Sequence, residues 1–339
     1  MEYVNLGTSG LKVSKIIIGA MSYGNQGWAK WVKPEEEALP LLKAAFDIGI
    51  NTWDTAGVYS NGESERIIGK AIKRYNIPRA QLVILTKCYF GVSDVPGELM
   101  GEVYNSRRWV NRNGLSRKHI LDAVDASVER LGTYIDVLQI HRLDHDTPGE
   151  EIMKALHDVI EAGKVRYIGA SSMYAWEFQM LQNIADKNGW TKFISMQNYY
   201  NLVYREEERE MIPYCNKTGV GIIPWSPLSR GTLARPYDSR TSYREKTDGF
   251  LSTQIRARET DADAAIIGRV GDIARRHGTT MATIALAWLL SKGACPIVGL
   301  ATVARIEEAA RAVKFKLDEK DIAYLEECYL PKAISGITF

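Results

Sequence analysis

Several features that would assign this chain of 339 residues to a specialised class of protein are absent. No apolar run approaches the roughly 18 residues that a membrane-spanning helix needs, so the sequence predicts no association with a membrane. The formal net charge of +2 excludes a general electrostatic preference for nucleic acid or acidic lipid. The N-terminus, MEYVNLGTSG, lacks the basic and then apolar segments of a secretory signal. We therefore expect a soluble, cytoplasmic protein.

Cysteine is also scarce. The four cysteines (Cys88, Cys215, Cys295 and Cys328) lie far apart and form no CxxC or Cys/His motif, so their spacing does not indicate zinc. A chain of this length buries most of its apolar surface without covalent cross-links. Reduced thiols are expected, as is usual in the cytoplasm.

What the sequence does contain is a repeated alternation of short β-branched runs and helical periods. It follows a segment, EYVNLGTSGLKVS, that alternates around a Ser-Gly turn and predicts a β-hairpin. Strands are expected at 15–20, 51–55, 82–87, 135–141, 165–170, 193–197, 220–226 and 295–300. Helices are expected at 35–48, 63–75, 117–131, 149–162, 174–187, 205–217, 262–291 (broken at His277-Gly278-Thr279), 303–313 and 318–329.

Strands this apolar are covered on both faces, which predicts a parallel sheet. Eight strand–helix units favour an α/β fold of the (β/α)₈ TIM-barrel type, with the hairpin at its N-terminus and one domain over residues 1–339. A doubly wound open sheet is the alternative. Two spacers, 89–116 and 228–261, are too long for simple connections. Both follow a strand, so in a barrel they lie at the C-terminal face, where active sites form.

Polar residues end three successive predicted strands. Asp54 follows the apolar start of the second strand, Lys87 ends the third, and His141 ends the fourth. Tyr59 lies in the small-residue loop after Asp54, close enough to fold back over the same barrel mouth. We expect these four side chains to converge.

The four side chains together form a tuned proton donor. A lysine ammonium about 4 Å from a phenol oxygen, at an effective dielectric constant near 20, interacts with a phenolate by roughly 4 kcal/mol. Asp54 would keep Lys87 charged and in place, and His141 could donate a hydrogen bond to a substrate oxygen. Reduction of a carbonyl group by hydride requires such a donor, because its oxygen gains negative charge.

Taken singly, each residue also has an ordinary structural explanation: a turn acid, a surface lysine, a core histidine and a packed loop tyrosine. The group His141, Asp144, His145 and Asp146 resembles a set of metal ligands, but its spacing does not place the side chains on one helical face, and no metal site is predicted. The basic stretch from Arg107 to Lys118 is read as a solvated loop and helix start rather than as a nucleic-acid surface.

The segment DTAGVYSNGESE resembles the signature of the aldo-keto reductase family, with Asp54 and Tyr59 at its matching positions. Lys87 in ILTK and His141 in LQIH match the other two catalytic positions. The resemblance covers nearly the whole chain, and it is strongest to the fungal aryl-alcohol-dehydrogenase-like branch. Further matching segments, in the same order, are GLSRKHI, RLGTYIDVLQIHRLD, GKVRYIGASS, PWSPLSRG and PIVG followed by ARIEEA. Because the four residues lie within matching flanks, the structural explanations fail jointly.

The resemblance implies a barrel that binds NADPH or NADP⁺ without a Rossmann fingerprint. The chain agrees, since no G-x-G-x-x-G opens a helix after a strand. It implies that Tyr59 is the proton donor, that Lys87 and Asp54 tune it, and that His141 orients the carbonyl. A small-molecule carbonyl compound is the expected partner, nucleic acid is not, and the sequence predicts no oligomeric state.

The resemblance also implies a cofactor groove. Ser171, Ser172 and Gln197 match positions at the nicotinamide carboxamide, although many members have Asn in place of Ser172. Trp225 matches the aromatic position that stacks on the nicotinamide. Many members carry Lys and Ser at the positions of Gly299 and Leu300, which leaves NADPH preference dependent on Arg305. The remaining matches are Gly19, Ala20 and Met21 after the first strand, Asp54 again, Ser226, Leu228, Arg230 and Gly231 at the pyrophosphate, and Glu308 beside the adenosine.

Aromatic residues near the predicted barrel mouth are candidates for a substrate wall beside Tyr59 and His141. They are Trp28, Phe90 and Tyr200, with rim packing as the other explanation for the tyrosine. They favour an aromatic or polyketide-like aldehyde or ketone. A rival function exists for the same fold and cofactor, since potassium-channel β subunits bind the nucleotide more as a sensor than as a substrate.

Overall fold

The structure is a computed structural model that describes residues 1–99 and 106–337. Its main sheet has eight parallel strands in the order β10-β3-β4-β5-β6-β7-β8-β9. A separate antiparallel pair, β1 (Tyr3–Asn5) and β2 (Lys12–Ser14), forms the predicted hairpin. The strands of the main sheet are β3 (Ile17–Gly19), β4 (Thr52–Asp54), β5 (Val83–Cys88), β6 (Ile135–Ile140), β7 (Val165–Ser171), β8 (Phe193–Gln197), β9 (Gly221–Ile222) and β10 (Ile297–Val298).

Backbone hydrogen bonds between the two ends of this strand order close the sheet into a barrel. The amide of Cys295 donates to the carbonyl of Ile222 at 2.9 Å, and the amide of Ile297 donates to the carbonyl of Pro224 at 2.9 Å. The first and last strands of the order therefore meet. The predicted (β/α)₈ architecture is confirmed, and the doubly wound alternative is wrong.

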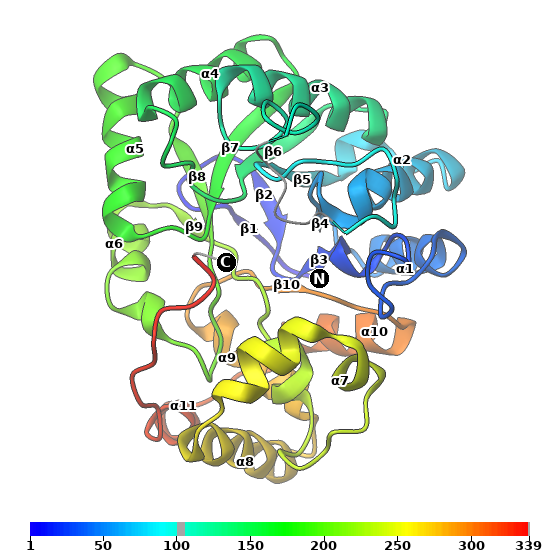
Figure 1. The fold of residues 1–339 in the computed structure, drawn as a ribbon. Helices are drawn as coiled ribbons and strands as arrows, with labels where there is room; N and C mark the ends of the chain where they lie inside the picture. Colours follow the sequence, from blue (N-terminus) through cyan, green and yellow to red (C-terminus); the bar gives the residue numbers. More distant parts are fainter. Residues whose placement is uncertain (100–105, 338–339) are drawn as a thin grey trace.

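Helices surround the barrel, as Figure 1 shows for α1 to α6 in a view along its axis. Several begin with a side-chain cap, such as Ser116 at α3 and Thr260 at α8, which satisfies a backbone N–H that the helix leaves unpaired. The helices are α1 (Glu35–Asp47), α2 (Glu63–Arg74), α3 (Arg117–Leu131), α4 (Gly149–Glu161), α5 (Ala175–Asn188), α6 (Met211–Thr218), α7 (Tyr243–Thr247), α8 (Asp261–Arg276), α9 (Met281–Ser291), α10 (Val303–Ala312) and α11 (Glu319–Glu326).

The barrel interior is apolar at the hairpin end and polar at the other end. Because side chains alternate along a strand, Val83, Leu85 and Lys87 share one face of β5. Leu85 packs with Val137 and with hairpin residue Val13 in one buried cluster, whereas Lys87 lies one layer further along the strand. The hairpin thus covers the apolar end of the barrel, and the polar layers face the opposite rim.

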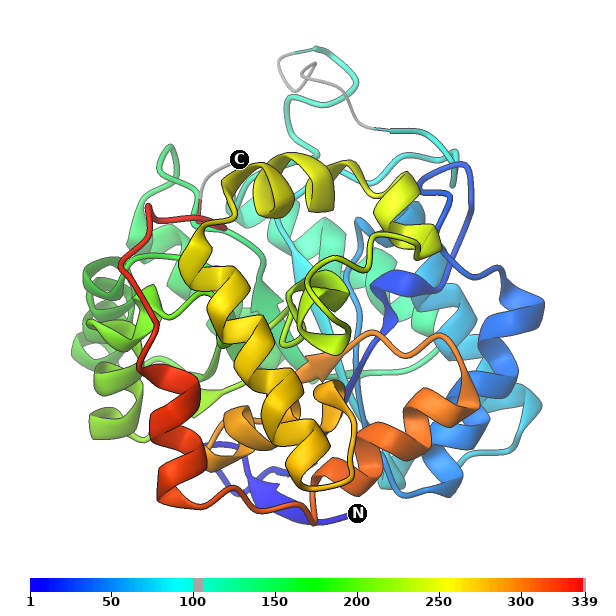
Figure 2. The ribbon, with the colours of Figure 1, turned by 90° about the horizontal axis from the view of Figure 1, so that it is seen from below.

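Both long spacers lie at that opposite rim. In Figure 2 the hairpin lies at the bottom of the molecule, and residues 89–99 and 106–116 lie at the top with the helical part of the loop 228–261. The loop 228–261 contains α7 and shorter helical turns, which the sequence did not predict. Residues 100–105 of the other loop lie outside the described part of the chain. Across residues 1–99 and 106–337, no helix is both long enough and apolar enough to cross a membrane.

Two predicted elements differ from the observed ones because of proline. The strand expected at 220–226 is assigned only over β9, since Pro224 has no N–H to donate to the ladder. The helix expected at 205–217 is replaced by a 3₁₀ turn at Glu206–Glu208 and by α6, which starts at Met211. Pro213 falls in the first turn of α6, where a missing N–H is tolerated.

Candidate active site

The four predicted catalytic residues, Asp54, Tyr59, Lys87 and His141, occupy one rim of the barrel and are called the tetrad below. Asp54 is the last residue of β4, and Lys87 lies near the end of β5. His141 directly follows β6, and Tyr59 opens the 3₁₀ turn Tyr59–Gly62 that follows β4. The parallel strands end at the same rim, so their terminal side chains face a common space.

Lys87 joins this group through all three N–H bonds of its ammonium. Its Nζ donates to Asp54 Oδ1 at 2.5 Å, to the carbonyl of Thr55 at 2.8 Å, and to the hydroxyl of Tyr59 at 3.3 Å. The side chain of Lys87 is 0% exposed and that of Asp54 is 3% exposed. The ammonium therefore has a fixed direction, with one donor aimed at the phenol oxygen.

The protonation states of Lys87 and His141 are set by their surroundings. Burial alone would lower the pKa of Lys87, but Asp54 and Tyr59 outweigh it, so the pKa lies above its ordinary value. Burial, together with the charges of Arg142 and Lys87, holds the pKa of His141 well below its ordinary value. At neutral pH the site thus presents a charged lysine and a neutral imidazole, which can still donate one hydrogen bond.

Aromatic rings flank the catalytic pair. The ring of His141 lies 5.8 Å from that of Tyr59 at an interplanar angle of 84°. On one side the indole of Trp28 lies 6.4 Å from the Tyr59 ring, and on the other the ring of Phe90 lies 5.1 Å from the imidazole. Two of the three aromatic residues predicted to form a substrate wall, Trp28 and Phe90, therefore lie beside the rings of Tyr59 and His141.

Tyr200, the third, is not placed there. Its ring is 1% exposed and lies 5.2 Å from the indole of Trp288 on α9, and its hydroxyl donates to Glu208 at 2.6 Å. Neighbouring residues of an extended segment point in opposite directions, and the ring of the preceding residue, Tyr199, stacks on that of Trp225 at 4.6 Å. The prediction that Tyr200 forms part of the substrate wall is wrong.

The predicted nicotinamide residues lie beside Asp54. Ser171 ends β7 and pairs with Gln197 at the end of β8, and the amide Nε2 of Gln197 donates to Asp54 Oδ2 at 3.0 Å. Ser172 follows in the left-handed region at φ 45° and accepts a hydrogen bond from Trp225 Nε1 at 3.0 Å. The serine that replaces the more usual Asn of the resembled family thus holds the indole of Trp225.

The predicted pyrophosphate loop turns through an unusual run of left-handed residues. Ser226 has φ 50°, Arg230 has φ 53°, and Gly231 has φ 103°, with Leu228 at the start of the 3₁₀ turn Ser229–Ala234. A glycine suits the last of these angles because it lacks a Cβ.

Asp248 joins Arg230 of this loop to Arg244 of α7. Its Oδ2 accepts from Arg230 Nη1 at 2.7 Å and from Arg244 Nε at 2.7 Å. The guanidinium of Arg230 also lies 4.1 Å from the ring centre of Phe250, and that of Arg244 lies 4.2 Å from the ring centre of Trp31. The two arginines are therefore held over the rim by one buried carboxylate.

Polar atoms in and beside this loop fit an anionic ligand. Arg230 Nε, Thr232 Oγ1 and Arg244 Nη2 are buried and have no hydrogen-bond partner within residues 1–99 and 106–337. A buried donor without a partner costs free energy, so such groups usually mark a ligand or an ordered water. The donors and the positive charges suit the pyrophosphate of a dinucleotide.

The predicted adenosine residues lie near the end of the chain. Arg305 and Glu308 belong to α10, and Gly299 directly follows β10. The charge of Arg305 acts on a second arginine, Arg235, whose pKa is lowered first by burial and then by that charge, while Glu245 acts in the opposite direction. Neither guanidinium forms an ion pair with another described residue, so the pair leaves an excess of positive charge.

The residues after the first barrel strand complete the rim. Gly19 ends β3 in register with Asp54, and Ala20 and Met21 begin the 3₁₀ turn Ala20–Ser22. The carbonyl of Ala20 accepts a hydrogen bond from Ser64 at 2.8 Å. Their backbone lies next to the tetrad.

Asp144, one of the acids after β6, holds its own loop together. The carboxylate of Asp144 accepts hydrogen bonds from the amides of Leu115 and Asp146 and from the hydroxyl of Thr147. In the part of the chain that the structure describes, no group of three or more His, Cys, Asp or Glu side chains could hold a metal ion.

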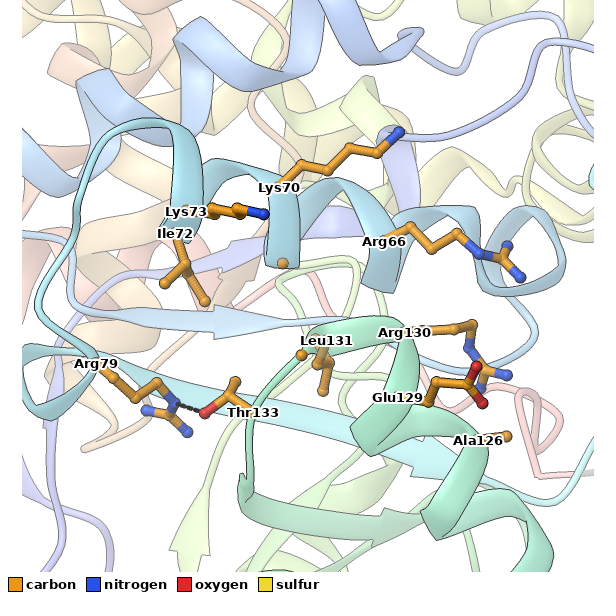
Figure 3. Close-up of a pocket in the computed structure, with 12 residues that line it drawn as sticks. Arg66, Lys70, Ile72, Lys73, Arg79, Ala126, Glu129, Arg130, Leu131 and Thr133 are labelled. Atoms are coloured by element: carbon orange, nitrogen blue, oxygen red, sulfur yellow. Dashed lines mark hydrogen bonds between the residues drawn. The ribbon is translucent and has the colours of Figure 1, made fainter.

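A basic groove of about 660 Å³ lies elsewhere, between α2 and α3 on the outside of the barrel (Figure 3). Four of its five cations are paired: Arg66 with Glu63, Lys70 with Glu35, Arg79 with Asp136, and Arg130 with Glu65. Within residues 1–99 and 106–337, no side chain that lines the groove has a buried polar atom without a hydrogen-bond partner, in contrast to Arg230 and Arg244, so the groove is not the candidate site.

Sequence reasoning missed three residues of the site. Gln139 was read as part of an apolar strand, although its spacing from His141 would have placed it on the inward face. Arg235 and Asp248 lie in the loop 228–261, and no periodic pattern pointed to them.

Comparison with known proteins adds independent information. The profile described as "Aldo/keto reductase family" matches residues 15–330. A versiconal hemiacetal acetate reductase of Aspergillus parasiticus is 62% identical over 338 residues, which cover 98% of both chains. A putative aryl-alcohol dehydrogenase of Schizosaccharomyces pombe is 54% identical over 345 residues, 98% of this chain and 97% of the relative. Another, from Saccharomyces cerevisiae, is 49% identical over 336 residues, 98% of both chains.

Proposed function

Because the chain belongs to the aldo/keto reductase family of oxidoreductases, we propose that it reduces an aromatic or polyketide-like aldehyde or ketone to the alcohol, reversibly and with NADPH. Bound NADPH supplies a hydride to the carbonyl carbon, and Tyr59 supplies the proton to the carbonyl oxygen. The observation that carries this proposal is the contact between Lys87 Nζ and the Tyr59 hydroxyl at 3.3 Å. It places a permanent positive charge where a phenolate forms.

In this proposal Lys87 stabilises the Tyr59 phenolate that remains after the proton has left. The Asp54 carboxylate keeps Lys87 protonated through its ion pair at 2.5 Å. The dry setting strengthens these interactions, because both charges lie out of water. The lysine acts most strongly when charge develops on the phenol oxygen, which lowers the barrier to proton transfer.

His141 is proposed to bind and orient the carbonyl oxygen. Its depressed pKa keeps the imidazole neutral, so it donates a hydrogen bond without competing with Tyr59 as an acid. The two rings lie 5.8 Å apart, which is close enough for the imidazole and the phenol to contact one carbonyl oxygen.

The substrate class follows from the rings of Trp28 and Phe90 on either side of the tetrad. Flat aromatic side chains favour a flat apolar substrate by offset or edge-to-face contact. The names of two relatives refer to aryl alcohols and that of a third to versiconal hemiacetal acetate, which supports the same class.

Preference for NADPH over NADH is attributed to Arg235 and Arg305. A guanidinium binds a phosphate by two parallel hydrogen bonds, and two arginines whose charges act on each other, neither in an ion pair with another described residue, suit the 2′-phosphate that distinguishes NADPH. Arg235 would thus replace the lysine that many members carry at the position of Gly299.

The direct test is NADPH oxidation with a panel of aromatic and aliphatic aldehydes. Tyr59→Phe keeps the ring and removes the proton, so kcat should fall by about 10²–10⁴-fold, while the dissociation constant for NADPH stays unchanged. Tyr75→Phe, at the end of α2 and away from the rim, is the matched control. Full activity of Tyr59→Phe would refute the assignment of the proton donor, and tight NADPH binding without turnover in the wild type would favour a nucleotide sensor.

A further inference from the structure

Gln139 lies in the polar layer of the barrel directly beneath the catalytic rim. It belongs to β6, two residues before His141, and is therefore on the same inward face of the strand. Its residue exposure is 0%. A buried primary amide is costly unless its groups are hydrogen-bonded, so its partners indicate its role.

Gln139, Gln197 and Asp54 are each hydrogen-bonded to the other two. Gln139 Nε2 donates to Asp54 Oδ2 at 2.9 Å, and Gln197 Nε2 donates to the same oxygen at 3.0 Å. Gln197 Nε2 also donates to Gln139 Oε1 at 2.8 Å. The triangle connects the carboxylate that holds Lys87 with the residue proposed to bind the nicotinamide.

We propose that Gln139 is a positioning residue that sets the orientation of both neighbours at once. The inference rests on the proposed function. Its amide shares Asp54 Oδ2 with Gln197, which leaves Oδ1 to accept from Lys87. The Asp54 carboxylate is thereby fixed from both sides, and with it the direction in which Lys87 presents its charge to Tyr59.

The second effect concerns the side-chain amide of Gln197. An amide nitrogen has two hydrogens, and both are used, one by Asp54 and one by Gln139 Oε1. The oxygen of Gln197 accepts no hydrogen bond from another described residue. It is therefore the atom of this amide that is left to bind a ligand. An acceptor at that point suits the N–H₂ of a nicotinamide carboxamide. Without Gln139, the amide could turn and present its nitrogen instead.

Two substitutions separate this role from simple packing. Gln139→Leu keeps the volume and removes both hydrogen bonds. We expect it to weaken NADPH binding and to lower kcat for an aromatic aldehyde, each by about tenfold or more, as for the loss of hydrogen bonds to charged or buried groups. NADPH affinity is measured by fluorescence titration and kcat by NADPH oxidation.

Gln139→Glu supplies the signature that packing would not produce. When protonated, the new carboxyl donates to Asp54 and accepts from Gln197, as the amide does. When ionised, it repels Asp54 across a dry space. The ratio of the kcat of Gln139→Glu to that of the wild type should therefore be close to one near pH 5.5, where it should exceed the ratio for Gln139→Leu. This ratio should fall as the new carboxyl ionises with rising pH.

Gln182→Leu is the matched control, because Gln182 is also buried and makes two hydrogen bonds, to the backbone of Phe193 on the outside of the barrel. It should leave kcat and NADPH affinity unchanged. Wild-type values for Gln139→Leu would overturn the proposal, and so would Gln139→Glu impaired as strongly as Gln139→Leu at every pH. If Gln139→Leu does not fold, the pH profile of Gln139→Glu decides. Failure of the wild type to reduce any carbonyl would instead refute the proposed function.

Discussion

The substitution Lys87→Met tests whether the positive charge beside Tyr59 acts in catalysis or only in folding. Methionine retains most of the lysine stem and removes the charge. The lost contacts are those to Asp54 at 2.5 Å, to the Thr55 carbonyl at 2.8 Å and to the Tyr59 hydroxyl at 3.3 Å. Two separate costs follow, one for stability and one for activity.

The activity cost can be bounded from the distance to the phenol oxygen. Two unit charges 3.3 Å apart interact by ~5 kcal/mol at an effective dielectric constant of about 20. At about 1.36 kcal/mol for each tenfold change, that is an upper limit of roughly 10⁴ in rate. Because Asp54 offsets part of the lysine charge, we expect kcat to fall by about 10²–10³, with little change in NADPH affinity.

The stability cost arises because Asp54 is left as a buried carboxylate without its partner. Breaking a buried ion pair costs about 3–5 kcal/mol. The double variant Asp54→Asn with Lys87→Met removes both charges, and it should recover much of this stability. It should not recover activity, because the charge beside Tyr59 is still missing.

The assay combines chemical denaturation with single-turnover NADPH oxidation, so that chemistry is measured apart from product release. Arg79→Met is the control, since it breaks the Asp136 ion pair of 2.5 Å near the start of β6, at the other end of the barrel. It should lower stability and leave turnover intact. Recovery of full turnover in the double variant would refute the electrostatic role of Lys87.

Three further outcomes are expected. Replacing Trp28 or Phe90 by alanine should raise KM for aromatic aldehydes by about two- to tenfold and should change KM for aliphatic aldehydes less. Initial-rate measurements with both classes of aldehyde would show this. Arg235→Ala should weaken NADPH binding by about tenfold or more and leave NADH binding unchanged, in paired titrations. Burial raises the pKa of Glu207 from 4.5 to about 7, so between these pH values the folded chain holds a proton that the unfolded chain has released. The free energy of unfolding should therefore fall by up to ~3 kcal/mol as pH rises from 4.5 to 8. Glu207→Gln should remove this loss in denaturant titrations at both pH values.

Asp54, Lys87 and His141 could be placed at one rim from the sequence because each interrupts an otherwise apolar run at a strand end, whereas Tyr59 lies in the loop that follows Asp54. Asp54, Lys87 and His141 follow β-branched residues, and the barrel places all strand ends at one rim. The prediction for Tyr200 was wrong because the direction in which its side chain points depends on the local backbone of an extended segment. Tyr199 faces Trp225 and Tyr200 faces Trp288, a difference of one residue that composition does not reveal.

The loop 228–261 could not be predicted in the same way. The loop is held by ion pairs, such as those of Asp248 with Arg230 and Arg244. Ion pairs leave no periodic hydrophobic pattern in the sequence. The pairing of Arg235 with Arg305 depends on where a long loop returns to α10, and no local pattern encodes that return. The fold class and the clustering of the strand-end residues thus follow from short-range patterns, whereas the contacts of this loop depend on tertiary geometry.

The hydrogen bond between Gln197 and Asp54 shows how the catalytic geometry depends on barrel closure. These residues end β8 and β4, which are separated in the strand order by β5, β6 and β7. In a flat sheet, four strand spacings of about 4.8 Å would hold them roughly 19 Å apart, yet Gln197 Nε2 lies 3.0 Å from Asp54 Oδ2. Curvature of the barrel brings the strand ends together across its interior. A doubly wound sheet with the same strand-end residues could align Lys87 beside Asp54, because β4 and β5 are neighbours, but it could not connect that pair to Gln197.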